Sequence, residues 1–352
     1  GAAGALKMKI AAGVAAGVVL AGGAGIALSQ SPAVTFADPA FEQNIRVLLD
    51  IPEGTIREDD LEEIYAFTIG DDEMGIFSSV GEETDLGSVN SLEDLALFSN
   101  LSWVSIKLND RDDAYLNDLL GTIGENPFLT DLIIIGETSQ APEVNDLSFL
   151  DGLPNLRSLE IEIASETDLT PLEERTSLMD LTVCLHGKTM DEQGRPLDIQ
   201  GDVLDISKLT ELRRLHLYDM SNIQNTVVLT TELPHMTMLE VDRWDNFPGA
   251  MELVSKMPGL EYISTCTVES QDLSPLAQLT QLRGVDLTAF QAPLDLTPLS
   301  QCPALEMCHI NEFEGGSIVP SGLPVETENG DSIWNIRDEI QNDIDSEIRS
   351  AD

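Results

Sequence analysis

A run of apolar residues at steps of three, closed by a step of two, constrains this fold more than any other feature. In residues 272–287, DLSPLAQLTQLRGVDL, the apolar positions lie at offsets 0, 3, 6, 9, 12 and 14 from Leu273. A plain helix alternates steps of three and four, and a strand shows steps of two. The same offsets recur in nine copies, which begin at residues 92, 120, 147, 169, 203, 227, 251, 273 and 296. Repeats of this length indicate a solenoid.

The steps inside each copy predict the shape of one coil. The last two apolar residues alternate with polar ones, as a strand requires, whereas the steps of three suit a tight helical turn or an irregular arc. Asp-Leu-Ser/Thr-Pro begins this arc at residues 168, 272 and 295. Proline fits there because its φ is suitable and no donor is needed. Stacked coils then share one leucine core. We therefore predict an α/β solenoid over residues 71–313, with a parallel sheet on the concave face and short helical or irregular segments on the convex side.

The repeats DLSPLAQLTQLRGVDL, DLSFLDGLPNLRSLEI and DLTPLSQCPALEMCHI resemble those of the leucine-rich-repeat proteins. They are most similar to the internalin-like kind found on Gram-positive bacterial surfaces. The stretch over residues 34–70 also resembles the module that commonly precedes such repeats. The resemblance implies a leucine-rich-repeat fold over residues 34–312. One departure is that the family's Asn at offset 17 occurs only as Asn109.

Both ends of the stack carry sequences that predict helical caps. At the front, residues 34–70 form the expected N-terminal cap, with Asp38 and Pro39 beginning a helix and a first edge strand near residues 67–69. At the back, residues 314–352 are expected to form an acidic loop and a C-terminal helix over residues 332–349. Its isoleucines step by three and four, at Ile333, Ile336, Ile340, Ile344 and Ile348. We favour a lid over the last repeat for this helix, and the alternative is a partner-binding helix.

The N-terminal segment, residues 1–33, predicts export. Residues 10–28 carry no charge and follow Lys7 and Lys9. Nineteen helical residues span roughly 28 Å, close to the hydrocarbon thickness of a bilayer. The segment is either an uncleaved membrane anchor or a signal peptide cut near Ala27-Leu28-Ser29. Both alternatives place the repeats at the cell surface or outside the cell.

The charge restricts the class of partner. The chain has 63 acidic residues against 18 Lys and Arg, a formal net charge of −45. Such a field repels phosphate backbones and anionic headgroups, so we expect no nucleic-acid partner and no membrane contact except through the N-terminal segment. A protein or peptide with a basic rim would suit this field.

No motif indicates catalysis or a cofactor. The four histidines are scattered, and no metalloprotease, nucleophile-elbow, phosphate-loop or dinucleotide-binding fingerprint occurs. The acidic runs near residues 71–73 and 110–113 lack calcium-loop spacing. We therefore predict no enzymatic activity, no cofactor and no metal site. The four cysteines also lack zinc-ligand spacing, and we predict that they are buried thiols.

The concave face offers one candidate ligand site. Offsets 11, 13 and 15 point to that surface, and three consecutive repeats place aromatic, cationic and methionine side chains there. The predicted ligand-binding residues are Arg214, His216, Tyr218, Met238, Glu240, Asp242, Trp244 and Tyr262. A second patch around Trp103, Ile133 and Ile135 is the alternative. These residues favour a protein-binding or adhesion module. A structural spacer without a specific ligand, or a regulatory domain of a larger enzyme, remain alternatives.

Overall fold

The computed structural model describes most of the repeat region and both flanking segments. The described residues are 31–71, 74–78, 83–86, 91–136, 141–185, 200–218, 223–243, 247, 249–267, 272–289, 293–312, 316–326 and 331–351. The expected anchor or signal peptide lies outside these residues. Among the helices inside them, none is long and apolar enough to cross a membrane.

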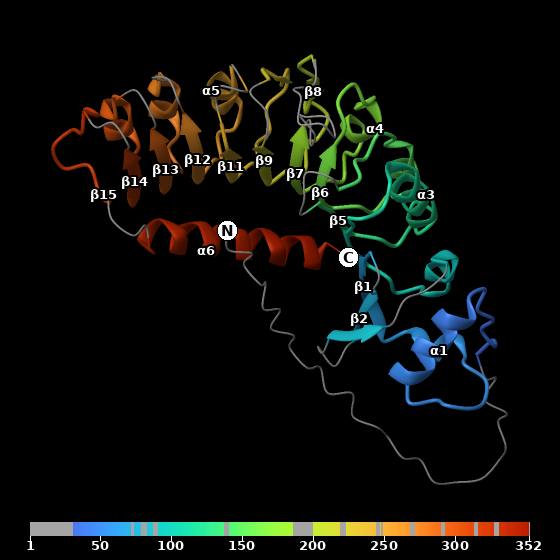
Figure 1. The fold of residues 1–352 in the computed structure, drawn as a ribbon. Coiled ribbons are helices and arrows are strands. Elements are labelled where there is room, and N and C mark those ends of the chain that lie inside the picture. The colour runs from blue at the N-terminus through green and yellow to red at the C-terminus, as the bar shows by residue number, and fades with distance from the viewer. Residues whose placement is uncertain are drawn as a thin grey trace, which may run out of the picture.

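One long sheet runs along the inner side of an arc (Figure 1). Eleven of its strands are parallel, in the spatial order β15-β14-β13-β12-β11-β9-β7-β6-β5-β4-β1. Their bounds are β1 Ile64–Gly70, β4 Trp103–Lys107, β5 Asp131–Ile134, β6 Ser158–Ile163, β7 Asp180–Leu185, β9 Arg214–Tyr218, β11 Met238–Val241, β12 Tyr262–Thr267, β13 Gly284–Ala289, β14 Met307–Glu312 and β15 Val325–Glu326. Beyond β1 the antiparallel strands β2 (Met74–Ser78) and β3 (Glu83–Leu86) extend the edge. A separate pair is formed by β8 (Val203–Asp205) and β10 (Thr226–Val228).

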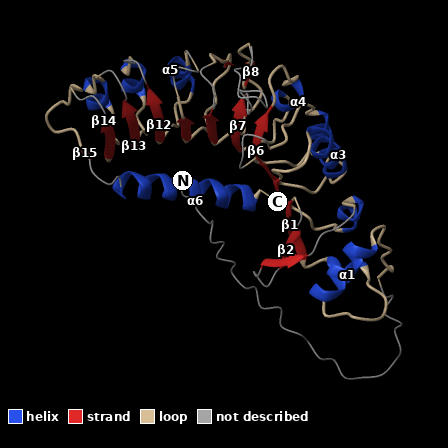
Figure 2. Cartoon of the chain, viewed as in Figure 1, coloured by secondary structure: helices blue, strands red, loops and turns tan. Residues whose placement is uncertain are grey.

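Short helical segments cover the outer side of the arc (Figure 2). Their bounds are η1 Glu93–Leu97, α3 Asp113–Ile123, η2 Ser148–Gly152, α4 Thr170–Glu173, α5 Ala250–Leu253, η4 Val254–Lys256, η5 Ser274–Gln278 and η6 Thr297–Gln301. The predicted 3₁₀ turns occur in the repeats that begin at residues 92, 147, 251, 273 and 296, whereas the repeats that begin at 203 and 227 carry the short strands β8 and β10 there instead. In the Asp-Leu-Ser/Thr-Pro arcs, Asp168, Asp272 and Asp295 each accept a hydrogen bond from the backbone N–H two residues later. The aspartate thus caps the turn that the proline begins.

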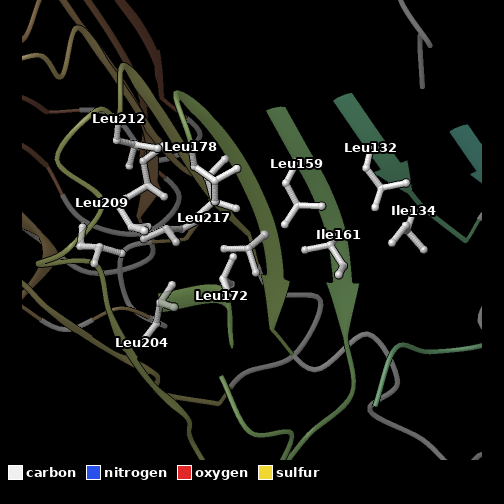
Figure 3. Packing of buried hydrophobic residues seen from close by; sticks show 14 of the residues in the cluster. Leu132, Ile134, Leu159, Ile161, Leu172, Leu178, Leu204, Leu209, Leu212 and Leu217 are labelled. Carbon is white, nitrogen blue, oxygen red and sulfur yellow. The ribbon is translucent and has the colours of Figure 1, made fainter. Parts of the chain in front are cut away.

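The predicted strand register is confirmed by the pairing of the coils. Residues at offset 12 of successive repeats are direct partners across the sheet: Val104, Leu132, Leu159, Leu181, Leu215, Leu239, Ile263, Val285 and Cys308. All are at most 2% exposed. Figure 3 shows part of this core, where side chains of neighbouring coils pack in rows. The offset pattern therefore fixes which side of each strand faces the core.

The cysteines behave as predicted. Cys184, Cys302 and Cys308 are buried, and Cys266 is partly buried. Burial raises the pKa of Cys308 to about 12, so this thiol stays protonated and packs as an apolar group.

Two N-terminal helices precede β1: α1 (Pro39–Leu48), which begins where predicted, and the short α2 (Glu58–Leu61). Phe41 of α1 packs against Phe67 of β1 and Phe98 of the first repeat, with ring centroids 6.1 and 5.9 Å away. Asp94 of η1 joins the same junction, because its buried carboxylate accepts hydrogen bonds from the backbone N–H groups of Ala37 and Asp38.

The C-terminal segment differs from its expected arrangement. Residues 316–326 were expected to be a loop, but they continue the solenoid: Val325 of β15 pairs with Cys308 of β14, and Ile318 forms a bridge with Asp295. The helix α6 (Asp331–Ser350) has the predicted bounds, but its predicted position as a lid over the last repeat is wrong. It crosses the inner face of the arc instead, on the side opposite α3, α4 and α5 (Figures 1 and 2).

We predict that Asp94→Ala destabilises the protein by about 1–3 kcal/mol, because two backbone N–H groups lose their acceptor at a buried junction. Glu93→Ala, at the exposed neighbouring position, should change the free energy of unfolding little. Urea unfolding of both variants checks this. Equal effects of the two substitutions would contradict the role of Asp94 in joining the N-terminal helices to the first coil.

Candidate binding face

The structure brings together most of the predicted ligand-binding residues on three adjacent strands. Arg214, Met238 and Tyr262 are direct partners across β9, β11 and β12, and His216 is the partner of Glu240. Tyr218 and Asp242 follow on or beside the same strands. Trp244 lies outside the described residues.

Much of this patch is not open to solvent, which corrects the expected exposure. Met238 and Tyr262 are 0% exposed and Glu240 is 7% exposed. The cause is α6, which lies directly on them. The buried isoleucines of α6 form one hydrophobic cluster with the concave side chains Met179, Met238, Tyr262 and Met307, which we call the methionine lane. This cluster is separate from the leucine core between the coils.

The dimensions of helix and sheet match. Contacts of α6 extend from Met307 of β14 to Arg157, next to β6, and so cross seven neighbouring strands. At about 4.8 Å between strands, this distance is roughly 29 Å. The 20 residues of α6 span about 30 Å at 1.5 Å each. One helical turn rises 5.4 Å, so each turn places one isoleucine over approximately one strand.

Gly284 makes room for the beginning of α6. A Cβ atom at this position on β13 would lie 2.9 Å from Tyr262 Cδ2, 3.0 Å from Ile333 Cδ1 and 3.2 Å from Ile336 Cγ2. These distances are shorter than ordinary van der Waals contacts. The glycine is therefore a requirement of close packing between helix and sheet, and its backbone conformation is ordinary.

An ion-pair network joins the helix to the middle of the sheet. Arg214 donates to Asp180 (2.9 Å) and to Glu240 (2.8 Å), and Arg337 of α6 donates to the other oxygen of Glu240 (2.8 Å). Burial alone would raise the pKa of Glu240, but the two guanidinium groups lower it to about 2. Since Arg214 pairs with both sheet carboxylates, this part of the network does not need the helix.

Further polar contacts hold α6 along its length. Arg283 contacts Glu339 (3.2 Å), Arg213 contacts Glu347 (2.7 Å), and Gln341 donates to Asp180 (3.1 Å). At the C-terminal end, the Arg157 guanidinium donates to the backbone oxygens of Ile348 (3.1 Å) and Ala351 (2.6 Å). These carbonyls lack partners within the helix, so the arginine satisfies its last turn.

Like charges also meet under the C-terminal half of α6. Asp131 on β5 is partly buried near Asp180 on β7 and Asp345 on α6. Burial, with the two neighbouring carboxylates, raises the pKa of Asp131 to about 6, although Thr130 donates to it and Arg349 of α6 opposes the shift. Burial likewise raises the pKa of Asp345. The native helix is therefore an imperfect electrostatic match to this end of the face.

The part of the predicted patch beyond α6 remains accessible. His216 contacts Asp242 (Nε2–Oδ1, 2.9 Å) and lies beside the Tyr218 ring, whose hydroxyl donates to Glu162 at 3.4 Å. The alternative patch lies on neighbouring strands nearer the N-terminus, where Trp103, Ile133 and Ile135 are partly exposed.

The sequence prediction missed the occupant of the face and several of its anchors. Met179, Arg157, Arg213 and Arg283 were not identified as site residues. A signal was present, because the inward offsets of several repeats carry apolar side chains where a solvated sheet carries polar ones. Those positions match the isoleucine stripe of α6, and pairing the two apolar surfaces would have placed the helix.

The register, the buried offsets and the outer turns decide the fold. The chain is a leucine-rich-repeat solenoid. Among solved structures, similar chains are internalin C2 of Listeria monocytogenes strain 4b F2365 (14% identity, TM-score 0.41, covering 80% of this chain and 98% of that one) and internalin F of the same strain (16% identity, TM-score 0.34, covering 87% and 100%). No protein-family model matches the sequence. No curated protein matches it at a significant level.

We predict that the stability contributed by Asp131 falls as the pH rises. Its folded-state pKa of about 6 lies above the ordinary aspartate value of 3.8, so the folded protein binds this proton more tightly. This advantage disappears between about pH 4 and pH 6. Asp131→Asn mimics the protonated acid. It should raise the free energy of unfolding by about 1–3 kcal/mol at pH 7.5 and by less at pH 5.

Urea unfolding at both pH values measures this difference. Asp343→Asn removes an exposed carboxylate of α6 and serves as the matched control. An Asp131→Asn effect that is the same at pH 5 and pH 7.5 would show that Asp131 is already ionised at both.

Proposed function

We propose that this chain is a protein-binding module of a bacterial surface or secreted protein and that its concave face recognises the partner. The observation that carries the proposal is the methionine lane. Its side chains form one apolar cluster with the isoleucines of α6 outside the solenoid core, so they already bind a protein segment. A spacer needs only a solvated polar face there.

The sheet around this lane supports specific recognition. Arg214, Asp180 and Glu240 are held in fixed positions by their mutual ion pairs, so their geometry exists before a partner arrives. His216 and Tyr218 lie next to them on β9 and remain accessible. Aromatic and arginine side chains of this kind dominate protein interfaces.

The net charge favours a basic partner. At −45, the chain attracts cationic surfaces over a distance comparable to the Debye length. The association rate with such a partner should therefore fall as salt is raised.

A photoreactive residue at position 218 tests the concave face directly. It should crosslink to a partner in extracts of the cells that the bacterium meets, and the same residue at position 203 should not. Val203 is 57% exposed and belongs to the small β8–β10 sheet, so it controls for nonspecific capture. Equal crosslinking at both positions, or none at either, would favour the spacer alternative.

For the purified partner, Tyr218→Ala should weaken binding by about 1–3 kcal/mol, as expected for an interface hot spot. Tyr262→Ala tests a different contact, because this ring is buried under α6 and its loss should loosen the helix. Isothermal titration calorimetry measures the affinity of both variants for the partner. Unchanged affinity in Tyr218→Ala would move the site toward Trp103 and Ile133.

We also propose that residues 10–28 direct export. An alkaline phosphatase fused after residue 40 should be active, because this enzyme folds only outside the reducing cytoplasm. Replacing Val18 and Leu20 with Asp should abolish the signal by interrupting the apolar segment. Activity that is absent in the unaltered fusion would refute export, and sequencing the mature N-terminus would separate anchor from cleaved peptide.

A further inference from the structure

We propose that the concave face is a receptor for an amphipathic helix of the partner, and that α6 occupies the site until this helix replaces it. The inference rests on the proposed function and specifies it: the ligand is a helix with one apolar residue per turn and a net positive charge.

The first argument is that α6 is independent of the solenoid core. Its buried isoleucines belong to the cluster of the methionine lane and form no part of the leucine cluster between the coils. The last coil is covered by β15 and its neighbouring residues, so α6 is not needed there. Removing the helix therefore uncovers a surface and leaves the core between the coils intact.

The second argument concerns the chemistry of the lane. Three of its four side chains are methionines, at positions 179, 238 and 307. Methionine is flexible and polarisable, and proteins use it on surfaces that accept more than one ligand. The ion pairs of Arg214 with Asp180 and Glu240 lie within the sheet, so loss of Arg337 does not leave Glu240 without a cation. The face is thus preorganised for a helix without depending on this particular one.

The third argument is that the native helix fits the face imperfectly in charge. Residues 331–352 contain seven acidic and two basic residues. Burial, together with repulsion from Asp180, raises the pKa of Asp345, although Gln341 and two arginines oppose the shift. A helix with a cation at this position would exchange repulsion for attraction. A basic amphipathic helix that keeps acidic residues opposite Arg283 and Arg213 therefore has an electrostatic advantage that can offset the higher effective concentration of the tethered α6.

The probe is a fluorescent synthetic peptide with the sequence of residues 331–352. Two full-length proteins are compared with the unaltered chain by fluorescence anisotropy. One carries Ile340→Asp and Ile344→Asp, which put charges into the lane and release α6. The other carries Asn335→Asp and Asn342→Asp, which add the same charge to exposed positions of the helix.

The released protein should bind the peptide at least about tenfold more tightly than the unaltered chain and the exposed-position control, because its own helix no longer competes. A peptide with Asp345→Lys should bind roughly tenfold more tightly than the native peptide, and a peptide with Ile340→Asp should not bind. Equal affinity of the released and unaltered proteins, or binding of the Ile340→Asp peptide, would overturn the proposal.

A second variant protects the test against misfolding of the first. Ile333→Asp and Ile336→Asp put charges where the beginning of α6 packs on Tyr262 and Gly284, and they leave the face that the peptide binds unaltered. This variant should also bind the peptide more tightly than the unaltered chain. If the unaltered chain instead forms a dimer that the peptide converts to a monomer, the occupant is the α6 of a second copy, and the proposal of an external helix is wrong.

The two levels of proposal fail separately. If the partner crosslinks at position 218 but the released protein binds no helical peptide, only the helical nature of the ligand is refuted. If the peptides bind as expected but no partner crosslinks to the concave face, the helix site stands and the proposed function fails.

Discussion

Parallel stacking of the coils in one fixed register is the constraint on which the rest of the structure depends. The buried residues at offset 12 pair directly from one coil to the next, from Val104 to Cys308. This alignment also fixes the positions of the side chains at the neighbouring offsets. A slip of one residue would turn the leucines outward. The register therefore also arranges the concave side chains in columns that run from strand to strand. Met238 and Tyr262 of the methionine lane are neighbours in one such column.

These columns explain how a single helix can cover so large a part of the concave face. The pitch of α6 is close to the strand spacing, so a residue pattern of one isoleucine per turn meets a sheet pattern of one side chain per strand. Gly284 leaves space for the beginning of α6, and Arg157 donates hydrogen bonds to the last carbonyls at its end. The ion pairs around Arg214 align the middle. Packing sets the position of the helix, and charge sets how tightly it is held.

Much of the fold could be predicted from the sequence, because repeated offsets specify burial directly. The parallel strands at the end of each repeat, most of the outer turns, α1 and the approximate bounds of α6 follow from local periodicity. The position of α6 could not be predicted in the same way, since an amphipathic pattern identifies an apolar face without identifying its partner surface. The strand β15 was missed because its two paired residues are too few to show alternation. At the candidate site, the sequence predicts that Arg214, Met238 and Tyr262 lie together, but it does not predict that α6 covers them.

The most direct measurement of the central claim is a methyl nuclear Overhauser experiment on the full chain, with labelled isoleucine and methionine methyl groups. Occupation of the concave face by α6 predicts cross-peaks between the isoleucines of residues 333–348 and the methionines at positions 179, 238 and 307. The contacts to Met179 and Met238 are absent from any arrangement in which the helix covers the last repeat or extends into solvent. Isoleucine cross-peaks confined to α6, with Met238 open to a soluble paramagnetic probe, would contradict the account.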